Sequence, residues 1–399
     1  MKSKIVVSAL FIFTVVTVVI YPMVNSKATT TPTTKLGYPP ETISASKIEV
    51  VFVLDTTGSM GGLIQAAKEK IWSIANTMAS AQSAPEIKMG LVAYRDRGDQ
   101  YVTQVVDLSE DLDSVYATLM DFRARGGGDG PESVNQALYD AVHKISWSAD
   151  QTTYKVVFLI GDAPPHMDYQ DDVKYPVTIN TALKKGIVIN SIQSGKSKRT
   201  AQRWQQIAQL GNGEFFRVEQ NGSAVAIATP FDRELAKLSK KMDATRLYYG
   251  DKTEKEKQKR KLAATEKLHA KASMESRARR ATFNSSKSGK SNLLGNGELV
   301  DDVSNGKVDL SKIDKDHLPE AMKAMSPTEQ KATINSAAKE RSALQSQIQV
   351  LADKRSDYLK RQFEKLGGEK DSLDEKMYRA VKKQAGKKGL RYESEAAAY

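Results

Sequence analysis

The strongest constraint on the fold is an almost continuously apolar and β-branched run, Ile48 to Leu54, which is followed at once by Asp55. Such a run is typical of a central strand that is buried on both faces of a parallel sheet. A second run of this kind, Val156 to Ile160, is followed by Gly161 and Asp162. Between and after these runs, apolar residues recur at helical spacing. The alternation predicts an α/β fold: a doubly wound, mostly parallel sheet with helices on both faces.

The same patterns predict the remaining elements of this domain. Further strands are expected at 87–94, 101–106, 187–192 and 215–218. Helices are expected at 60–80, 111–122, 131–146 and 200–209. Another helix, at 231–247, carries its apolar residues on one face and is expected to close the domain.

Ligands of open α/β sheets bind at the carboxyl ends of the strands, and both buried strands here lead into an aspartate. After the first strand, Asp55, Thr57 and Ser59 alternate, so a tight loop that bends at Gly58 directs three oxygens to one point. Asp162, after the second strand, adds a fourth oxygen ligand. Carboxylate and hydroxyl oxygens suit a small, hard divalent cation, Mg²⁺ or Mn²⁺ before Ca²⁺. In the alternative reading, Asp55, Ser59 and Asp162 cap the helices or turns that follow them.

The arrangement of Asp55, Thr57 and Ser59 after a buried strand, with Asp162 after a later one, resembles the von Willebrand factor type A domain and its metal-ion-dependent adhesion site. The resemblance covers residues 46–248 and implies a Rossmann-like fold in a bacterial exported protein. It also implies that Thr57 and Ser59 bind the ion directly, and that Asp55 and Asp162 hold it directly or through water. An acidic side chain of a partner protein would complete the coordination.

One position departs from the family's pattern. The middle ligand, usually a Thr, comes from the loop before a later helix, and the corresponding loop here, Gly126 to Glu132, contains no Thr. Glu132 stands where the Thr would be when the following helix is aligned through Ala137 and Leu138. The integrin β-subunit version of the domain also has a Glu on the metal, so the resemblance favours Glu132 as the third ligand. Asp129 is then a neighbour that serves a second ion, or is itself the third ligand.

The chain has no cysteine and four histidines, which excludes disulfides, thiolate metal sites, iron–sulfur clusters and cysteine nucleophiles. His166 lies close to the predicted site in the sequence, four residues after Asp162. A hydrolase would need a nucleophile, a base and an orienting group within reach of one another. Because the predicted ion site already uses Ser59, we expect no enzyme activity, with a metal-assisted hydrolase as a minor alternative.

The N-terminus has the pattern of an export signal. Residues 1–28 begin with Lys2 and Lys4, continue as an apolar run from Ile5 to Ile20, and end in small and polar residues. This pattern is typical of a cleaved signal peptide, and its length also fits an uncleaved membrane anchor. Either reading places the rest of the chain outside the cytoplasm, in the periplasm or cell envelope or secreted. Residues 29–45 are rich in Thr and Pro and are expected to form a linker.

The net charge of +12 is uneven, because residues 250–399 carry 33 Lys and Arg against 23 Asp and Glu. Residues 249–298 are expected to form an exposed charged helix, or to be disordered, followed by a linker. Residues 299–399 are expected to form a helical hairpin or coiled coil, whose long helix begins at the capping box Ser326 to Glu329. An exported basic region of this kind would meet an anionic membrane surface or an envelope polymer, and no nucleic acid is expected.

The sequence therefore favours a metal-dependent protein-binding or adhesion module outside the cytoplasm, which binds a partner's carboxylate through a Mg²⁺-type ion. The alternative is a structural or scaffold protein of the cell envelope. In that reading the basic C-terminal helices make the contacts, and the metal only stabilises the fold.

Overall fold

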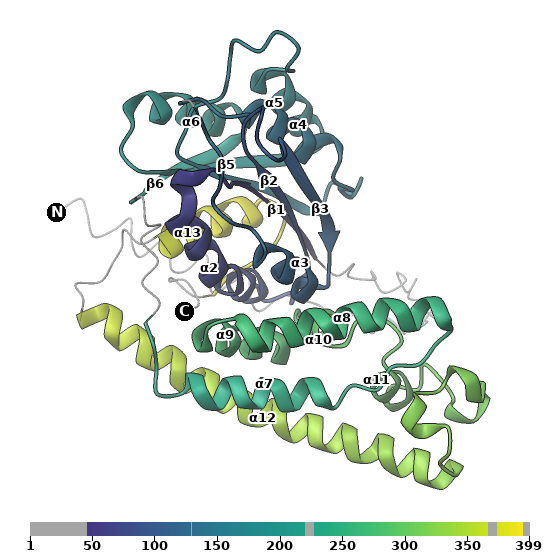
Figure 1. Cartoon of the computed structure of the whole chain (residues 1–399). Coiled ribbons are helices and arrows are strands. Elements are labelled where there is room, and N and C mark those ends of the chain that lie inside the picture. The colour runs from purple at the N-terminus through teal and green to yellow at the C-terminus, as the bar shows by residue number, and fades with distance from the viewer. Residues whose placement is uncertain (1–45, 129, 220–226, 366–372, 394–399) are drawn as a thin grey trace, which may run out of the picture. The chain divides into compact units, whose positions relative to one another are not determined.

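The computed structural model describes residues 46–128, 130–219, 227–365 and 373–393 (Figure 1). The predicted export segment 1–28, the predicted linker 29–45 and Asp129 lie outside these residues. Within the described ranges, no helix combines the length and the apolar character that crossing a membrane requires.

A six-stranded sheet forms the centre of the α/β domain, with the strand order β3-β2-β1-β4-β5-β6 (Figure 1). β1 is parallel to both of its neighbours, β2 and β4, which explains why its side chains are almost all buried. β3 pairs antiparallel with β2 at one edge and is partly exposed. The predicted mostly parallel α/β fold is confirmed. The strands are β1 Lys47–Asp55, β2 Glu86–Tyr94, β3 Thr103–Ser109, β4 Tyr154–Gly161, β5 Ile187–Ser194 and β6 Asn212–Val218.

Each face of the sheet has its own hydrophobic core, because successive side chains of a strand point to opposite faces. Val51 and Val53 of β1 belong to the core that α4, α5 and α6 cover. Phe52 and Leu54 belong to the core that α2, α3 and α13 cover. These helices are α2 Gly61–Ala79, α3 Leu112–Leu119, α4 Val134–His143, α5 Tyr175–Lys184, α6 Lys198–Leu210 and α13 Leu373–Gly386.

The helix predicted at 231–247 is present as α7 Asp232–Ala244, but it packs elsewhere than predicted. Its apolar residues Leu235, Leu238 and Met242 form a separate core with α9 Met274–Ser285 and α12 Pro327–Lys365. The C-terminal helix α13 packs on the sheet instead, against α2 and β6 (Figure 1). The sequence pattern showed that α7 has an apolar face, but such a pattern does not identify the surface that covers the face.

The charged segment after residue 250 also differs in part from the prediction. α8 Lys252–Lys271 is a helix with a largely exposed outer side, as expected, and it packs against α3. α9 is largely buried between α2 and α7. Its Arg280 is fully buried because it pairs with Asp113 of α3 and Asp243 of α7. The many charges of this segment do not indicate exposure, since several are neutralised inside the structure.

The long helix α12 begins at the predicted capping box. The backbone N–H of Ser326 donates to Oε2 of Glu329 over 2.7 Å, and the N–H of Glu329 donates to the hydroxyl of Ser326 over 3.4 Å. α12 then runs along α7, α9 and α11 Leu299–Ser304. The expected hairpin with α13 does not form, because α13 packs on the sheet. The segment between α9 and α11, expected to be a linker, contains α10 Lys290–Leu294, whose Leu293 and Leu294 are buried.

Candidate metal centre

Asp55 ends β1 and is completely buried. One of its carboxylate oxygens, Oδ1, accepts hydrogen bonds from the backbone N–H of Thr57 at 2.9 Å and from the Thr57 hydroxyl at 2.6 Å. The other oxygen, Oδ2, is buried and has no hydrogen-bond partner. Because the Thr57 hydroxyl donates its proton to Asp55, its lone pairs remain available to a cation.

Three loops meet at the carboxyl edge of the sheet. Backbone hydrogen bonds join the loop after β1 to the loop before α4, from the N–H of Gly58 to the carbonyl of Gly126 at 3.0 Å and from the N–H of Arg125 to the carbonyl of Thr56 at 3.1 Å. The N–H of Glu132 bonds to the carbonyl of Pro164 in the loop after β4, also at 3.0 Å. The three segments that carry the predicted ligands are therefore neighbours at this edge of the sheet.

Glu132 lies at the centre of this convergence. Its side chain is 4% exposed, and its Oε2 atom is buried without a hydrogen-bond partner. Gly127, with φ at +82°, passes close to both Thr57 and Glu132: a Cβ added there would lie 3.3 Å from Thr57 Cβ and 3.4 Å from Glu132 Oε1. The left-handed backbone and the narrow gap together explain a glycine at this position.

The two buried carboxyl groups hold their protons unusually tightly in the absence of a cation. Burial, together with the charge of Asp162, raises the pKa of Asp55 to about 7 in spite of the hydrogen bonds from Thr57, which lower it. Burial, together with the charges of Asp55, Asp96, Asp99 and Asp162, raises the pKa of Glu132 to about 9. A cluster of carboxylates with this property favours whichever positive charge is offered to it, a proton or a metal ion.

The remaining predicted ligands are placed as follows. Ser59 is exposed at the rim, and Asp162 is half-buried and close enough to Asp55 and Glu132 to influence the pKa of both. Asp129 lies outside the described residues. No cluster of three or more His, Asp or Glu side chains with the spacing of a metal site occurs in the part of the chain that the structure describes. The three described acids of the predicted set, Asp55, Glu132 and Asp162, are therefore not grouped with that spacing.

Two acidic residues of this edge were missed by sequence reasoning. Asp96 and Asp99 follow β2, the strand next to β1, and both add to the negative charge around Glu132. Asp96 accepts hydrogen bonds from the hydroxyls of Ser133 at 2.8 Å and Tyr169 at 2.9 Å. The rule that singled out Asp55 and Asp162, an acid just after a strand, would have found Asp96 if it had been applied to β2.

His166 is buried between carboxylates. Its Nδ1 lies 2.9 Å from Oδ1 of Asp168, its Nε2 lies 3.3 Å from Oδ2 of Asp96, and its ring stacks on Tyr169 with a centroid distance of 4.0 Å. Both ring nitrogens thus face acidic groups. These contacts hold the loop after β4 against the segment that follows β2, so His166 positions these two segments relative to each other.

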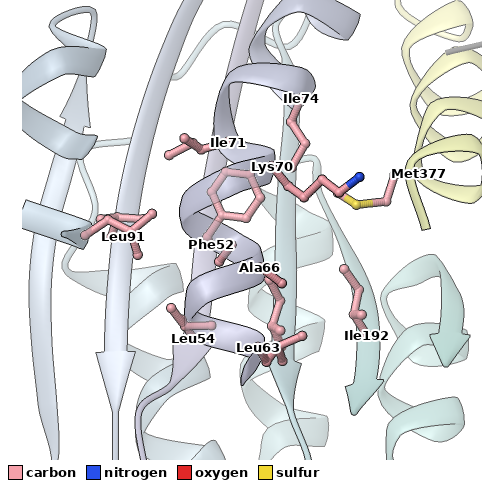
Figure 2. A pocket seen from close by; sticks show the side chains of 13 residues that line it. Phe52, Leu54, Leu63, Ala66, Lys70, Ile71, Ile74, Leu91, Ile192 and Met377 are labelled. Atoms are coloured by element: carbon pink, nitrogen blue, oxygen red, sulfur yellow. The ribbon is translucent and has the colours of Figure 1, made fainter. Parts of the chain in front are cut away.

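A separate apolar cavity of about 40 Å³ lies between α2, the sheet and α13 (Figure 2). Phe52, Leu54 and Ile192 line it from the sheet, and Met377 from α13. Figure 2 shows the side chain of Lys70 extending toward Met377 at its edge. The cavity offers almost no polar atoms and little volume, so we treat it as a packing defect beneath α13.

Comparisons with known proteins agree with this architecture. The family model described as von Willebrand factor A domain matches residues 49–229, somewhat less than half of the chain. An ariadne-like RING finger protein of Acanthamoeba polyphaga mimivirus is 24% identical over 146 residues, which is 37% of this chain and 14% of that protein. An alpha-protein kinase of Dictyostelium discoideum is 29% identical over 120 residues, 30% of this chain and 19% of that protein. The chain thus spans less than a fifth of each relative's length.

Among solved structures, the VWA domain of SpRpn10 has a TM-score of 0.35 and 14% identity, over 45% of this chain and 91% of that one. Proximal thread matrix protein 1 from the mussel byssus has a TM-score of 0.34 and 16% identity, over 44% of this chain and 42% of that one. Both scores are low, so the fold is assigned from the sheet topology and the family match. These two observations support a von Willebrand factor A domain over residues 49–229 of the chain.

Proposed function

We propose that the chain is a metal-dependent protein-binding module that holds a Mg²⁺-type divalent cation at the carboxyl edge of its sheet. The observation that carries this proposal is the pair of buried, unpartnered carboxylate oxygens, Asp55 Oδ2 and Glu132 Oε2. A buried carboxylate oxygen with no partner is costly, and a cation satisfies it. A von Willebrand factor A domain in itself suggests a protein–protein interaction module.

The residues present fit such an ion. Asp55, Thr57, Glu132 and Asp162 would hold it with oxygen atoms alone, and Ser59 would join them from the rim. Hard oxygen donors of this kind suit Mg²⁺ better than softer metals. When bound, the ion would supply a concentrated positive charge that attracts a carboxylate. The chain's own residues orient that charge, since Thr57 is fixed by Asp55 and Glu132 is fixed by the loop after β4.

The partner would be a protein that presents an acidic side chain, and no catalysis is proposed. The exposed position of Ser59 gives such a side chain access to the edge. The location that we propose is outside the cytoplasm, in the periplasm or cell envelope or secreted. This part of the proposal is supported by the export-type pattern of residues 1–28.

Thermal unfolding of the full chain in Mg²⁺, Mn²⁺, Ca²⁺ or chelator tests the ion site. A ligand present at 100 times its dissociation constant stabilises the folded state by about 2.7 kcal/mol. We expect a rise in melting temperature with Mg²⁺ that disappears in Asp55→Ala. Asp150→Ala is the control and should keep the rise, because Asp150 lies before β4, at the opposite end of this strand from Asp162. A folded wild-type chain without any shift at millimolar metal would refute the proposal.

A second candidate function has its own observation. A cleft of about 520 Å³ beside α7 and α9 is lined by five cationic side chains, with exposed Met274 at its edge. Those cations are Arg233, Lys237, Lys240, Lys241 and Arg277. The helical region would then act as an envelope scaffold on an anionic membrane or polymer. Sedimentation with vesicles of anionic phospholipid tests this idea. Support would be binding that salt weakens, that a chelator does not affect, and that Lys240→Gln with Lys241→Gln reduces. Equal binding to neutral vesicles would contradict it.

A further inference from the structure

A cleft of about 630 Å³ adjoins the candidate metal centre, and the proposed ion does not use it. Pro131, Pro164 and Pro165 line it, together with Met167, whose side chain is 38% exposed. The cleft begins directly beside Glu132, because the N–H of Glu132 bonds to the carbonyl of Pro164 and Glu132 bridges to Pro165. A partner segment that reached the ion would therefore have this cleft next to it, with prolines on the side nearest Glu132 and polar side chains on the other.

The cleft is also lined by His166, by Asp168, which pairs with His166, and by an exposed, cationic face of α6. Arg199 and Arg203 stand one helical turn apart on this face, and both are exposed. α6 contains no acidic residue that would pair with them. Neither arginine forms an ion pair with any residue that the structure describes. Asp168, the one acid among the described residues that line the cleft, pairs with His166 instead. Two adjacent guanidinium groups that form no ion pair with a described carboxylate are a natural receptor for one, since each offers a planar fork of donors.

α6 is held firmly against the edge of the sheet. The hydroxyl of Thr200 donates to the backbone carbonyl of Asp162 at 3.0 Å, and the indole N–H of Trp204 donates to the carbonyl of Ala163 at 2.9 Å. Each of these anchors directly follows one of the arginines in sequence. The two guanidinium groups are therefore carried by a backbone that is fixed to the loop of the candidate metal centre, which lowers the entropy cost of binding.

The charges of this region are divided between two places. Asp55, Asp96, Glu132 and Asp162 make the edge acidic, so that without a cation it repels an acidic ligand. The α6 face beyond the cleft is cationic. A ligand with one acidic side chain would bind only the ion, whereas a ligand with two would bind both the ion and the arginines of α6.

We propose that the partner presents an extended segment with two acidic side chains, one for the ion and a second for Arg199 and Arg203, while the residues between them lie on the proline-lined cleft. This inference rests on the proposed function, because the first acid requires the ion. The second acid defines which partners are accepted, and α6 is accordingly a specificity element of the domain.

An array of synthetic peptides tests the spacing directly. Each peptide carries one fixed glutamate and a second glutamate placed from adjacent to about eight residues away, with Pro and Leu between them. The labelled full chain is applied in Mg²⁺ and in chelator. We expect the strongest binding at one narrow range of spacings, and only in Mg²⁺. Arg199→Gln with Arg203→Gln should weaken that binding about tenfold. It should leave the weaker binding of single-glutamate peptides unchanged.

Lys360→Gln with Arg361→Gln removes the same charge from the exposed side of α12, outside both cationic clefts, and is the matched control, which should bind like the wild type. Equal binding of single- and double-glutamate peptides, or an arginine double variant that binds normally, would overturn the inference. Either result differs from failure of the proposed function. If only this inference is wrong, the Mg²⁺-dependent rise in melting temperature persists; if the proposed function is wrong, that rise is absent. If that rise persists and no peptide binds, the two-acid segment is likewise refuted.

Discussion

Individual side chains decide whether the edge of the sheet holds a proton or a metal ion. The pKa of Asp55 is about 7 against a usual value of 3.8, and that of Glu132 is about 9 against 4.5. In the metal-free chain, the folded state therefore binds protons more tightly than the unfolded state. The contribution of these two carboxyl groups to the free energy of unfolding is fully present below their usual pKa values. It is lost as the pH rises through about 7 for Asp55 and then about 9 for Glu132.

A pH dependence of metal binding follows from these pKa values. A divalent cation has to displace the protons of Asp55 and Glu132, so its affinity should rise with pH. We expect the Mg²⁺-induced increase in melting temperature to be small near pH 6 and to grow toward about pH 9. Scanning calorimetry at matched ionic strength, with and without Mg²⁺, measures it. An increase that is constant over this range, or that shrinks as the pH rises, would contradict the assignment.

Glu132→Gln separates the two roles of this residue. With a pKa of about 9, Glu132 is protonated near neutral pH in the metal-free chain, and an amide resembles that protonated group in size and hydrogen bonding. We expect the variant to melt at the same temperature as the wild type in chelator, but to bind Mg²⁺ about tenfold or more weakly. Strong destabilisation in chelator would show that the glutamate is structural, and an unchanged Mg²⁺ affinity would exclude it as a ligand.

Among the elements, α13 has the most unexpected role. It comes from the C-terminal end of the chain and covers the sheet beside α2, with Met377, Tyr378 and Val381 buried in the same core as β1. Polar contacts reinforce this packing, since the side chain of Gln384 accepts from the hydroxyl of Tyr154 at 2.7 Å and donates to Asn190 at 2.8 Å. The sheet thus depends on a helix that lies more than 140 residues beyond the end of the matched family region.

Met377→Ala tests this dependence. Truncation of a buried methionine costs about 2–5 kcal/mol, and here it would enlarge a cavity that already exists under α13. We expect a clear loss of stability of the full chain in urea unfolding. Lys383→Ala, on the exposed side of the same helix, should unfold like the wild type. If both variants unfold alike, α13 does not contribute to the core of the sheet.

The sequence allowed most of the sheet to be predicted, because its buried strands are continuous apolar runs. It failed for α5, in which Val177, Thr178, Ile179 and Thr181 are β-branched and obscure the helical pattern, although Pro176 marks its first turn. It also did not reveal that β3 is antiparallel, since its pattern of side chains does not specify direction. The loops after β1 and β4 could be predicted from the acids that follow these strands, whereas the loop before α4 could be located only through the resemblance. Arg199 and Arg203 could not, because their importance comes from the way α6 is anchored.

In the whole described unit, a buried ionic network joins the α/β domain to the helices after residue 250. Arg280 of α9 contacts Asp113 of α3 and Asp243 of α7, and Asp113 also accepts from Thr265 of α8 at 2.9 Å. The charge of Arg280 lowers the pKa of both aspartates against the effect of burial. The helical region is thereby fixed to the sheet domain, and we expect the two to unfold together.

Arg280→Met tests the joint unfolding. The variant leaves two buried carboxylates without their cation, which costs about 3–5 kcal/mol. In calorimetry we expect a lower melting temperature. We also expect the single cooperative transition of the wild type to split, because the helical region and the sheet domain no longer unfold together. Arg260→Met, on the exposed side of α8, is the matched control and should behave like the wild type. Adding Asp113→Asn and Asp243→Asn to Arg280→Met should recover part of the stability, and the absence of any recovery would show that the network is not the cause.

Counting the Mn²⁺ ions bound per chain, by electron paramagnetic resonance of the full chain at neutral pH, is the most decisive experiment for the metal centre. The arrangement of Asp55, Thr57 and Glu132 predicts that the wild type binds a single Mn²⁺ in competition with Mg²⁺, and that Asp55→Ala binds none. A folded wild type that binds no Mn²⁺ at millimolar concentration, or an Asp55→Ala variant that binds as the wild type does, would contradict a metal-dependent function for this protein.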